Sequence, residues 1–165
     1  MESIIRSIKI TAIVFIMCVA AFMLYVIQIC LIPEEIAVMN PLISGFLHQG
    51  VEHLLLNMMV MFIAMLHPIN SGFSWKSIFI ITTIISLIYL PIAILGITSF
   101  AIGLSVTCYF FLTRGTINWG WIGKAIIFIL FVSEASSLFS GDNTAHGVHL
   151  IGMVLGSISL RISNQ

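Results

Sequence analysis

Apolar residues fall into six long stretches along the chain, and connections rich in Gly, Pro, Asn and Ser separate them. The pattern predicts six helices, at residues 9–32, 51–66, 77–95, 103–113, 119–138 and 145–162. The first is long enough to cross a membrane alone, because a crossing helix needs about 20 residues. We therefore predict an all-α polytopic membrane protein with six transmembrane helices.

The first stretch also has features of a secretory signal, since Arg6 and Lys9 precede it. Its apolar run is too long for the apolar region of a signal peptide, and no small-residue cleavage site follows. We therefore expect a retained helix. The length leaves no room for a separate soluble module, so residues 1–165 are expected to form a single membrane domain.

Composition supports the membrane prediction, because 60% of the residues are hydrophobic and only 7% are charged. Soluble domains carry about 25% charged residues, so this chain must use lipid as its solvent over most of its surface. The formal net charge is zero, which gives no basic footprint for nucleic acid. The three cysteines form no CxxC pair and no metal-ligand spacing, and are interpreted as small apolar residues.

Charged residues separate between the two ends of the predicted helices. With six crossings and an inner N-terminus, the inner side holds every basic residue: Arg6, Lys9, Lys76, Arg114, Lys124 and Arg161. The outer side holds only acidic ones: Glu34, Glu35, Glu52, Glu134 and Asp142. This is the positive-inside pattern. It predicts a multi-pass protein with both termini cytoplasmic, and we expect a bacterial inner membrane as its location.

Four polar side chains lie at a depth where polar groups are costly and usually functional. His53 and Asn57 are four residues apart and share a helix face, Ser105 opens the fourth stretch, and His149 lies in the sixth. At ~1.5 Å per residue, Ser105, Asn57 and His149 lie about 14–18 Å from the inner interface. Because the hydrocarbon core is ~30 Å thick, we expect one shared site near the middle of the membrane.

The fourth stretch is too short to cross, since its eleven or so residues reach only ~17 Å. Segment 95–102 is therefore expected to dip inward beside a water-filled cavity. The helix N-terminus at Ser105 offers free N–H groups, which suit a nucleophile whose product is an oxyanion. In the sixth stretch, Gly152 and Gly156 form a GxxxG face that lets a neighbouring backbone approach closely.

These residues together resemble the rhomboid intramembrane serine proteases, over the whole chain. The second-helix pattern of the family is matched by His48, His53, Asn57 and Met58. Its Gly-x-Ser-Gly stretch is similar to Gly103-Leu104-Ser105-Val106, and its aromatic residue four positions after the serine is matched by Tyr109. Its sixth-helix pattern is matched by His149, Gly152 and Gly156.

The resemblance implies a six-helix bundle with a short fourth helix and an endopeptidase activity on single-pass membrane proteins in the lipid bilayer, without a cofactor. It implies a catalytic dyad of Ser105 and His149 with no third acid, and an oxyanion hole from the Ser105 N–H, the His53 side chain and the Asn57 amide. Tyr109 is expected to stack on the histidine, and His48 to position the outer loop.

Two valines depart from the family pattern. Val106 replaces the usual glycine after the serine, and Val148 precedes the histidine where a small residue is common. Branched side chains at facing positions are expected to widen the contact between the fourth and sixth helices. We therefore predict a long Ser105–His149 distance in the resting protein, and higher activity in Val106→Gly.

Two alternatives stay open from the sequence. The first is a catalytically inactive rhomboid-like protein that binds membrane clients, which the two valines favour. The second is a metal-dependent membrane protein with the ligands His48, His53, His146 and His149. A missing carboxylate ligand and the lack of an HExxH motif count against it. Otherwise His146 is expected to be a wet residue at the outer end of the sixth helix.

Overall fold

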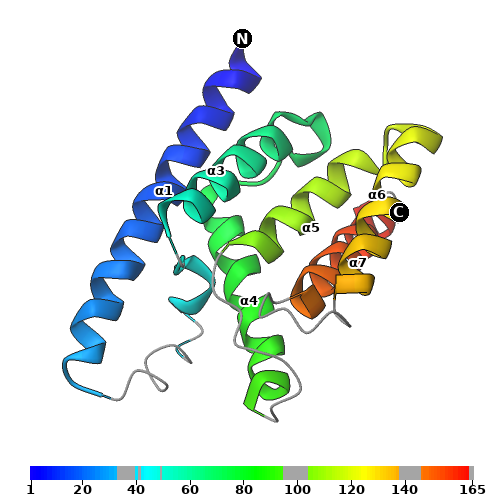
Figure 1. The fold of residues 1–165 in the computed structure, drawn as a ribbon. Coiled ribbons are helices and arrows are strands. Elements are labelled where there is room, and N and C mark those ends of the chain that lie inside the picture. Colours follow the sequence, from blue (N-terminus) through cyan, green and yellow to red (C-terminus); the bar gives the residue numbers. More distant parts are fainter. Residues whose placement is uncertain (33–39, 41, 49, 95–103, 138–145, 164–165) are drawn as a thin grey trace.

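A computed structural model describes residues 1–32, 40, 42–48, 50–94, 104–137 and 146–163, and every regular element in that part of the chain is helical (Figure 1). The α-helices are α1 (Glu2–Ile29), α3 (Val51–Leu66), α4 (Trp75–Ile94), α5 (Ser105–Thr116), α6 (Gly120–Ser137) and α7 (His146–Ser163). Two short 3-10 helices, η1 (Ser44–Phe46) and η2 (Pro68–Asn70), flank α3. The predicted all-α fold is confirmed, and each predicted helix has a counterpart.

The largest difference from the prediction is the start of α1, which begins at Glu2 instead of residue 9. Two polar side chains in the added turns have long-range partners. Arg6 donates to the carbonyl oxygens of Met65, Asn70 and Ser71, and Ser7 donates to that of Phe62 at 2.8 Å. A cation satisfies the free carbonyls at a helix C-terminus, so these turns are stabilised by the end of α3 rather than by an apolar pattern.

Helix α5 is the centre of the fold. It packs against α3, α4, α6 and α7, and nine of its twelve residues are buried. Its side chains join the neighbouring helices through polar contacts as well, such as the 2.8 Å hydrogen bond between Thr82 of α4 and Thr107. With 12 residues, α5 is about 18 Å long, so the short fourth helix is confirmed. The N-terminus of α5 therefore lies within the helical assembly.

Helices α5 and α7 run parallel and touch backbone to backbone. A Cβ atom added to Gly152 would lie 2.4 Å from the carbonyl oxygen of Val106, and one added to Gly156 would lie 2.4 Å from that of Phe110. Real Cβ atoms do not approach so closely, so only glycine fits at either position. The GxxxG face predicted from the sequence is therefore the contact surface of α7 with α5.

The two ends of the helical assembly differ in chemistry. At one end, the side chain of Asn70 donates to Phe111 of α5, and Arg114 donates to Ser159 of α7 at 2.8 Å. Arg6 lies at the same end through its bond to Asn70. At the other end, Ser105 of α5 lies next to His149 of α7. The basic side chains that these contacts place thus gather at the end away from Ser105.

The outer faces of the helices are apolar. Large hydrophobic residues are exposed along α1 and α6, for example Ile16, which is 64% exposed, and Phe128, which is 68% exposed. Both helices are long and apolar enough to cross a membrane, and shorter apolar helices cover residues 51–66, 75–91 and 146–159. Such exposure is unfavourable in water and suits a lipid environment.

We expect alanine at Gly152 or Gly156 to lower the stability of the folded protein, because each added Cβ atom would force the α5 and α7 backbones apart. Overpacking of this kind costs about 1–3 kcal/mol. Unfolding of the purified protein in detergent measures the effect. Gly72→Ala is the matched control, since a Cβ atom there meets nothing within 4 Å. Equal stability of all three variants would contradict the close contact.

Candidate active site

Ser105 is the first residue of α5, where the helix geometry leaves its hydroxyl and the first backbone N–H groups pointing away from the helix. Its Oγ lies 2.9 Å from Nε2 of His149, which projects from the first turn of α7 and is only 8% exposed. This is the distance of a hydrogen bond between a nucleophile and its general base. The two residues predicted as a catalytic pair are therefore in contact.

The second ring nitrogen of His149 faces a carboxylate. Nδ1 lies 3.0 Å from Oε2 of Glu134, a buried residue near the end of α6. A carboxylate in its ionised form only accepts hydrogen bonds, so opposite an ionised Glu134 the Nδ1–H group of His149 is the donor. In the neutral ring Nε2 is then an acceptor, and the Ser105 hydroxyl donates a hydrogen bond to it.

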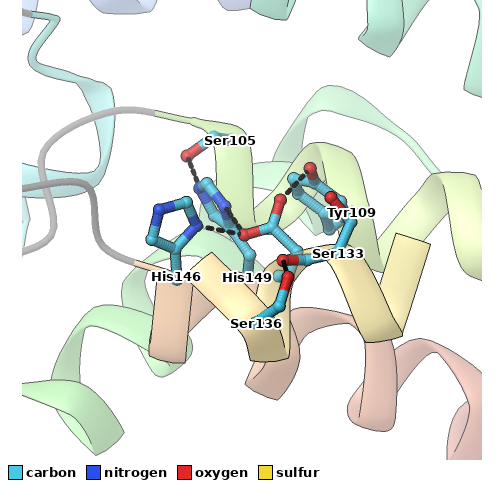
Figure 2. A network of polar contacts seen from close by, with 7 residues as sticks. Ser105, Tyr109, Ser133, Ser136, His146 and His149 are labelled. Atoms are coloured by element: carbon cyan, nitrogen blue, oxygen red, sulfur yellow. Dashed lines mark hydrogen bonds and ion pairs between the residues drawn. The ribbon is translucent and has the colours of Figure 1, made fainter. Parts of the chain in front are cut away.

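Glu134 has two further partners. Oε2 also accepts from Nδ1 of His146 at 2.6 Å, and Oε1 accepts a short hydrogen bond from the Tyr109 hydroxyl. Figure 2 shows the imidazoles of His146 and His149 converging on the same carboxylate oxygen, with Ser105 on the far side of the His149 ring. The carboxylate thus has donors from α5 and α7 while it projects from α6.

The expectation that no acid supports the histidine is wrong, since Glu134 lies in hydrogen-bond contact with His149. Glu134 was predicted to be one of the acidic residues on the outer side, so its contact with His149 was not expected. A carboxylate within an apolar helix is itself a sign of function. In addition, a short connection joins α6 to α7, so the last turns of α6 must face the first turns of α7, where His146 and His149 lie. The sequence carried both signals.

Tyr109 stacks on the histidine, as the resemblance implied. Its ring centroid lies 4.6 Å from that of His149, with an angle of 23° between the planes. Tyr109 is one turn after Ser105 in α5, so its ring covers the face of the imidazole while its hydroxyl reaches Glu134. The stacking restricts rotation of the His149 ring between its two hydrogen-bond partners.

The expectation that two valines lengthen the Ser105–His149 distance is wrong, because that distance is 2.9 Å. Val106 and Val148 are 3% and 1% exposed and form one apolar cluster with Ile85 and Tyr89 of α4. They fill space between three helices instead of separating two. The missing side chain of Gly152 leaves room for Val106, whose Cγ2 would lie 3.1 Å from a Cβ atom there. The packing argument for an inactive protein is thereby removed.

Two of the predicted oxyanion donors, His53 and Asn57, lie on α3, which packs against α5. Asn57 is 4% exposed, and among the residues that the structure describes its amide Nδ2 has no hydrogen-bond partner. A buried donor without a partner is unfavourable and is often explained by function. Interhelical polar bonding, the other interpretation of this side chain, requires a partner. An unpaired buried donor of this kind is compatible with the oxyanion role that the resemblance implies.

The histidines at the start of α3 form a pair. The rings of His48 and His53 are 5.2 Å apart in an edge-to-face arrangement, and Nδ1 of His48 donates to the carbonyl oxygen of Phe46 at 2.9 Å. Burial lowers the pKa of His48 to about 4, so this ring is neutral near pH 7. His48 thus holds the backbone of Phe46 just before α3, and its role in positioning the outer loop stays a prediction. Gly103 and segment 95–102 lie outside the described residues.

A metal site is the other chemistry that these residues allow. In the described part of the chain, Glu134, His146 and His149 bring three ligand atoms within 4.8 Å of one another. This set includes a carboxylate ligand, which the four histidines predicted as metal ligands lacked, but it does not include His48 or His53. Ligands bound at about 2.0–2.2 Å around a tetrahedral zinc ion are separated by about 3.3 Å. The 2.6 Å between His146 and Glu134 is shorter and fits a charge-assisted hydrogen bond.

His146 was expected to be a wet residue at the outer end of its helix. The structure places it half-buried, at the first position of α7 and bonded to Glu134.

Comparisons of the chain with models of protein families, with curated proteins and with solved structures found no match. The arrangement is thus described by its own geometry: a serine hydroxyl, an imidazole and a carboxylate in one chain of hydrogen bonds.

We expect Asn57→Leu to slow the reaction of Ser105 with a fluorophosphonate by about 10–1,000-fold, the effect of losing one oxyanion donor. Stability should fall little, because Nδ2 of Asn57 has no hydrogen-bond partner among the described residues. His53→Ala should slow labelling similarly. Asn70→Leu is the contrasting control, since the amide of Asn70 donates to Ala64 and Phe111. It should cost stability of about 1–3 kcal/mol. Unchanged labelling in the Asn57 and His53 variants would assign both residues a structural role.

Proposed function

We propose that this chain is an intramembrane serine endopeptidase of the rhomboid type, which cleaves transmembrane segments of membrane proteins. The observation that carries the proposal is the 2.9 Å contact between Ser105 Oγ and His149 Nε2, with the other nitrogen of the ring bonded to a buried carboxylate. A serine hydroxyl is a weak nucleophile by itself and is activated by an adjacent base in this geometry. The pairing of such a contact with apolar outer faces favours a membrane substrate.

The reaction is acyl transfer in two halves. Ser105 Oγ attacks the peptide carbonyl as its proton moves to Nε2 of His149, and the resulting imidazolium protonates the leaving amine as the C–N bond breaks. Water then attacks the acyl-enzyme, with His149 again accepting a proton and returning it to Ser105. The oxyanion of each tetrahedral intermediate would be stabilised by the Ser105 N–H and by the donors of His53 and Asn57.

The substrate is expected to be a single-pass membrane helix, cut near its outer end. Ser105 lies nine residues from Arg114, the basic residue in the last turn of α5, and thus about 14 Å from the inner interface. The sequence resemblance implies small residues at the cleavage point. The proposed mechanism needs no cofactor, because the proton transfers use side chains of the chain itself.

The topology proposed with this function is six crossings with both termini cytoplasmic, in a bacterial inner membrane. The first turns of α1, the end of α3 and the end of α5 share one end of the molecule. Arg6 and Arg114 belong to this end, Lys76 and Lys124 begin the helices that follow, and Arg161 falls in the last turn of α7. Basic residues stay on the cytoplasmic side of a membrane, so this end is assigned there.

We predict that Ser105→Ala and His149→Ala each abolish cleavage of a single-pass model substrate in liposomes. The double variant should be little worse than either, because residues that act as a unit are not additive. Fluorophosphonate should label the parent protein at Ser105 only. Ser157→Ala is the matched control, since that hydroxyl bonds the Met153 carbonyl of its own helix. Substantial activity in either single variant would contradict the catalytic pair.

Reporter fusions test the topology. A reporter active only in the cytoplasm should be active when fused after Gln165, and inactive when inserted near Gly141 in the connection between α6 and α7. The expectation follows from the position of the basic residues at the opposite end of the helices from Ser105. An outward C-terminus would contradict the six-crossing arrangement, whatever the activity of the protein.

A further inference from the structure

We infer that Glu134 is a positioning residue that turns the serine–histidine pair into a Ser105–His149–Glu134 triad, with Tyr109 and His146 holding the carboxylate in place. The inference rests on the proposed function. It also makes a statement about the histidine tautomer that is testable without any turnover. Three donors converge on this one buried carboxylate.

Burial explains why the carboxylate needs these donors. Glu134 is 8% exposed, and an isolated ion out of water costs several kcal/mol. Three donors compensate for that cost: the Tyr109 hydroxyl on Oε1, and the two imidazole N–H groups on Oε2. Every one of them contacts an acceptor-only group. The carboxylate is thus held ionised and in one orientation.

The orientation determines the tautomer of His149. Because Oε2 takes the proton-bearing Nδ1, the lone pair of Nε2 is directed at Ser105 Oγ. With the opposite tautomer, Nε2 would donate to the serine and could not remove its proton. In serine proteases with an acid at this position, loss of the correct tautomer costs about 10⁴-fold in kcat. The geometry here places Glu134 in that role.

Charge adds to orientation during the reaction. When His149 accepts the serine proton it becomes an imidazolium ion, 3.0 Å from the Glu134 oxygen. An ion pair of this kind is worth more in a low-dielectric site than in water. Glu134 keeps its negative charge throughout and gains no proton, so it acts through His149 rather than on the substrate.

His146 and Tyr109 have a secondary role, since they position Glu134. Both belong to helices other than α6, so they tie the carboxylate to the two helices that carry the serine and the histidine. Among the described residues, the titratable groups in contact with His149 are Tyr109 from α5, Glu134 from α6 and His146 from α7. A protonated His53 on α3 would disfavour a positive charge on the His149 ring.

Glu134→Gln tests the charge while it conserves shape. In full-length protein in liposomes we expect kcat for a model substrate to fall by about 10²–10⁴-fold at unchanged KM. The acidic limb of the pH–rate profile should move to lower pH, because the imidazolium loses its counter-ion. Rates are expressed per Ser105 that fluorophosphonate labels at completion, which corrects for misfolded protein. Glu52→Gln, an exposed carboxylate in the first turn of α3, is the matched control and should match the parent.

The second measurement does not depend on activity or on the Glu134 variant folding. The chain has five histidines, so nitrogen NMR of ¹⁵N-histidine-labelled Ser105→Ala protein is assignable by single substitutions. We expect His146 and His149 both to carry the proton on Nδ1. If the parent protein cleaves no substrate, the proposed protease activity is refuted. Nδ1–H tautomers at His146 and His149 would still support the positioning role of Glu134. An Nε2–H tautomer of His149, or a parent rate and pH profile in Glu134→Gln, would overturn the inference. Inhibition by a chelator that zinc reverses would assign these residues to a metal site instead.

Discussion

The separation of α5 and α7 is the constraint on which the site depends. Gly152 and Gly156 let the carbonyl oxygens of Val106 and Phe110 approach to distances that any side chain would prevent. The parallel helices then bring the first turn of α5 against the first turn of α7, and the Ser105–His149 hydrogen bond follows at 2.9 Å. The contact is between rigid backbones, so the distance does not rely on flexible side chains. The two buried valines pack beside this contact and leave it unchanged.

The carboxylate of Glu134 adds a third helix to that arrangement. A buried charge is tolerated only when its partners are well placed, and here the partners come from α5 and α7. The same hydrogen bonds that stabilise the charge therefore hold α6 against the other two helices. Orientation of the histidine and cohesion of the three helices are consequences of one network. In surroundings as apolar as the outer faces of this protein, water competes little for these bonds, which strengthens them.

The helix pattern and the pairing of Ser105 with His149 were predictable from local features. Apolar stretches bounded by Gly, Pro and Asn located every described α-helix, because a long apolar run has few alternatives in lipid. Ser105 and His149 were predicted as polar residues at matching depth in their helices, and Tyr109 was predicted from the family resemblance. Glu134 was missed because a charge near a helix end is usually a solvated one. The early start of α1 was missed because carbonyl groups of α3 and η2, distant in sequence, satisfy Arg6.

By itself, then, the sequence determined the α-helical class, the order and length of the helices, the short fourth helix, the gathering of basic residues towards one end, and the glycine face of α7. Those properties depend on residue type and on spacing within one helix. Tertiary structure alone decided which acid supports His149, which way Val106 and Val148 point, and that His146 joins the network. These depend on the rotation of each helix about its axis relative to its neighbours. That rotation is fixed by packing between residues far apart in the chain, and spacing within a single helix does not encode it.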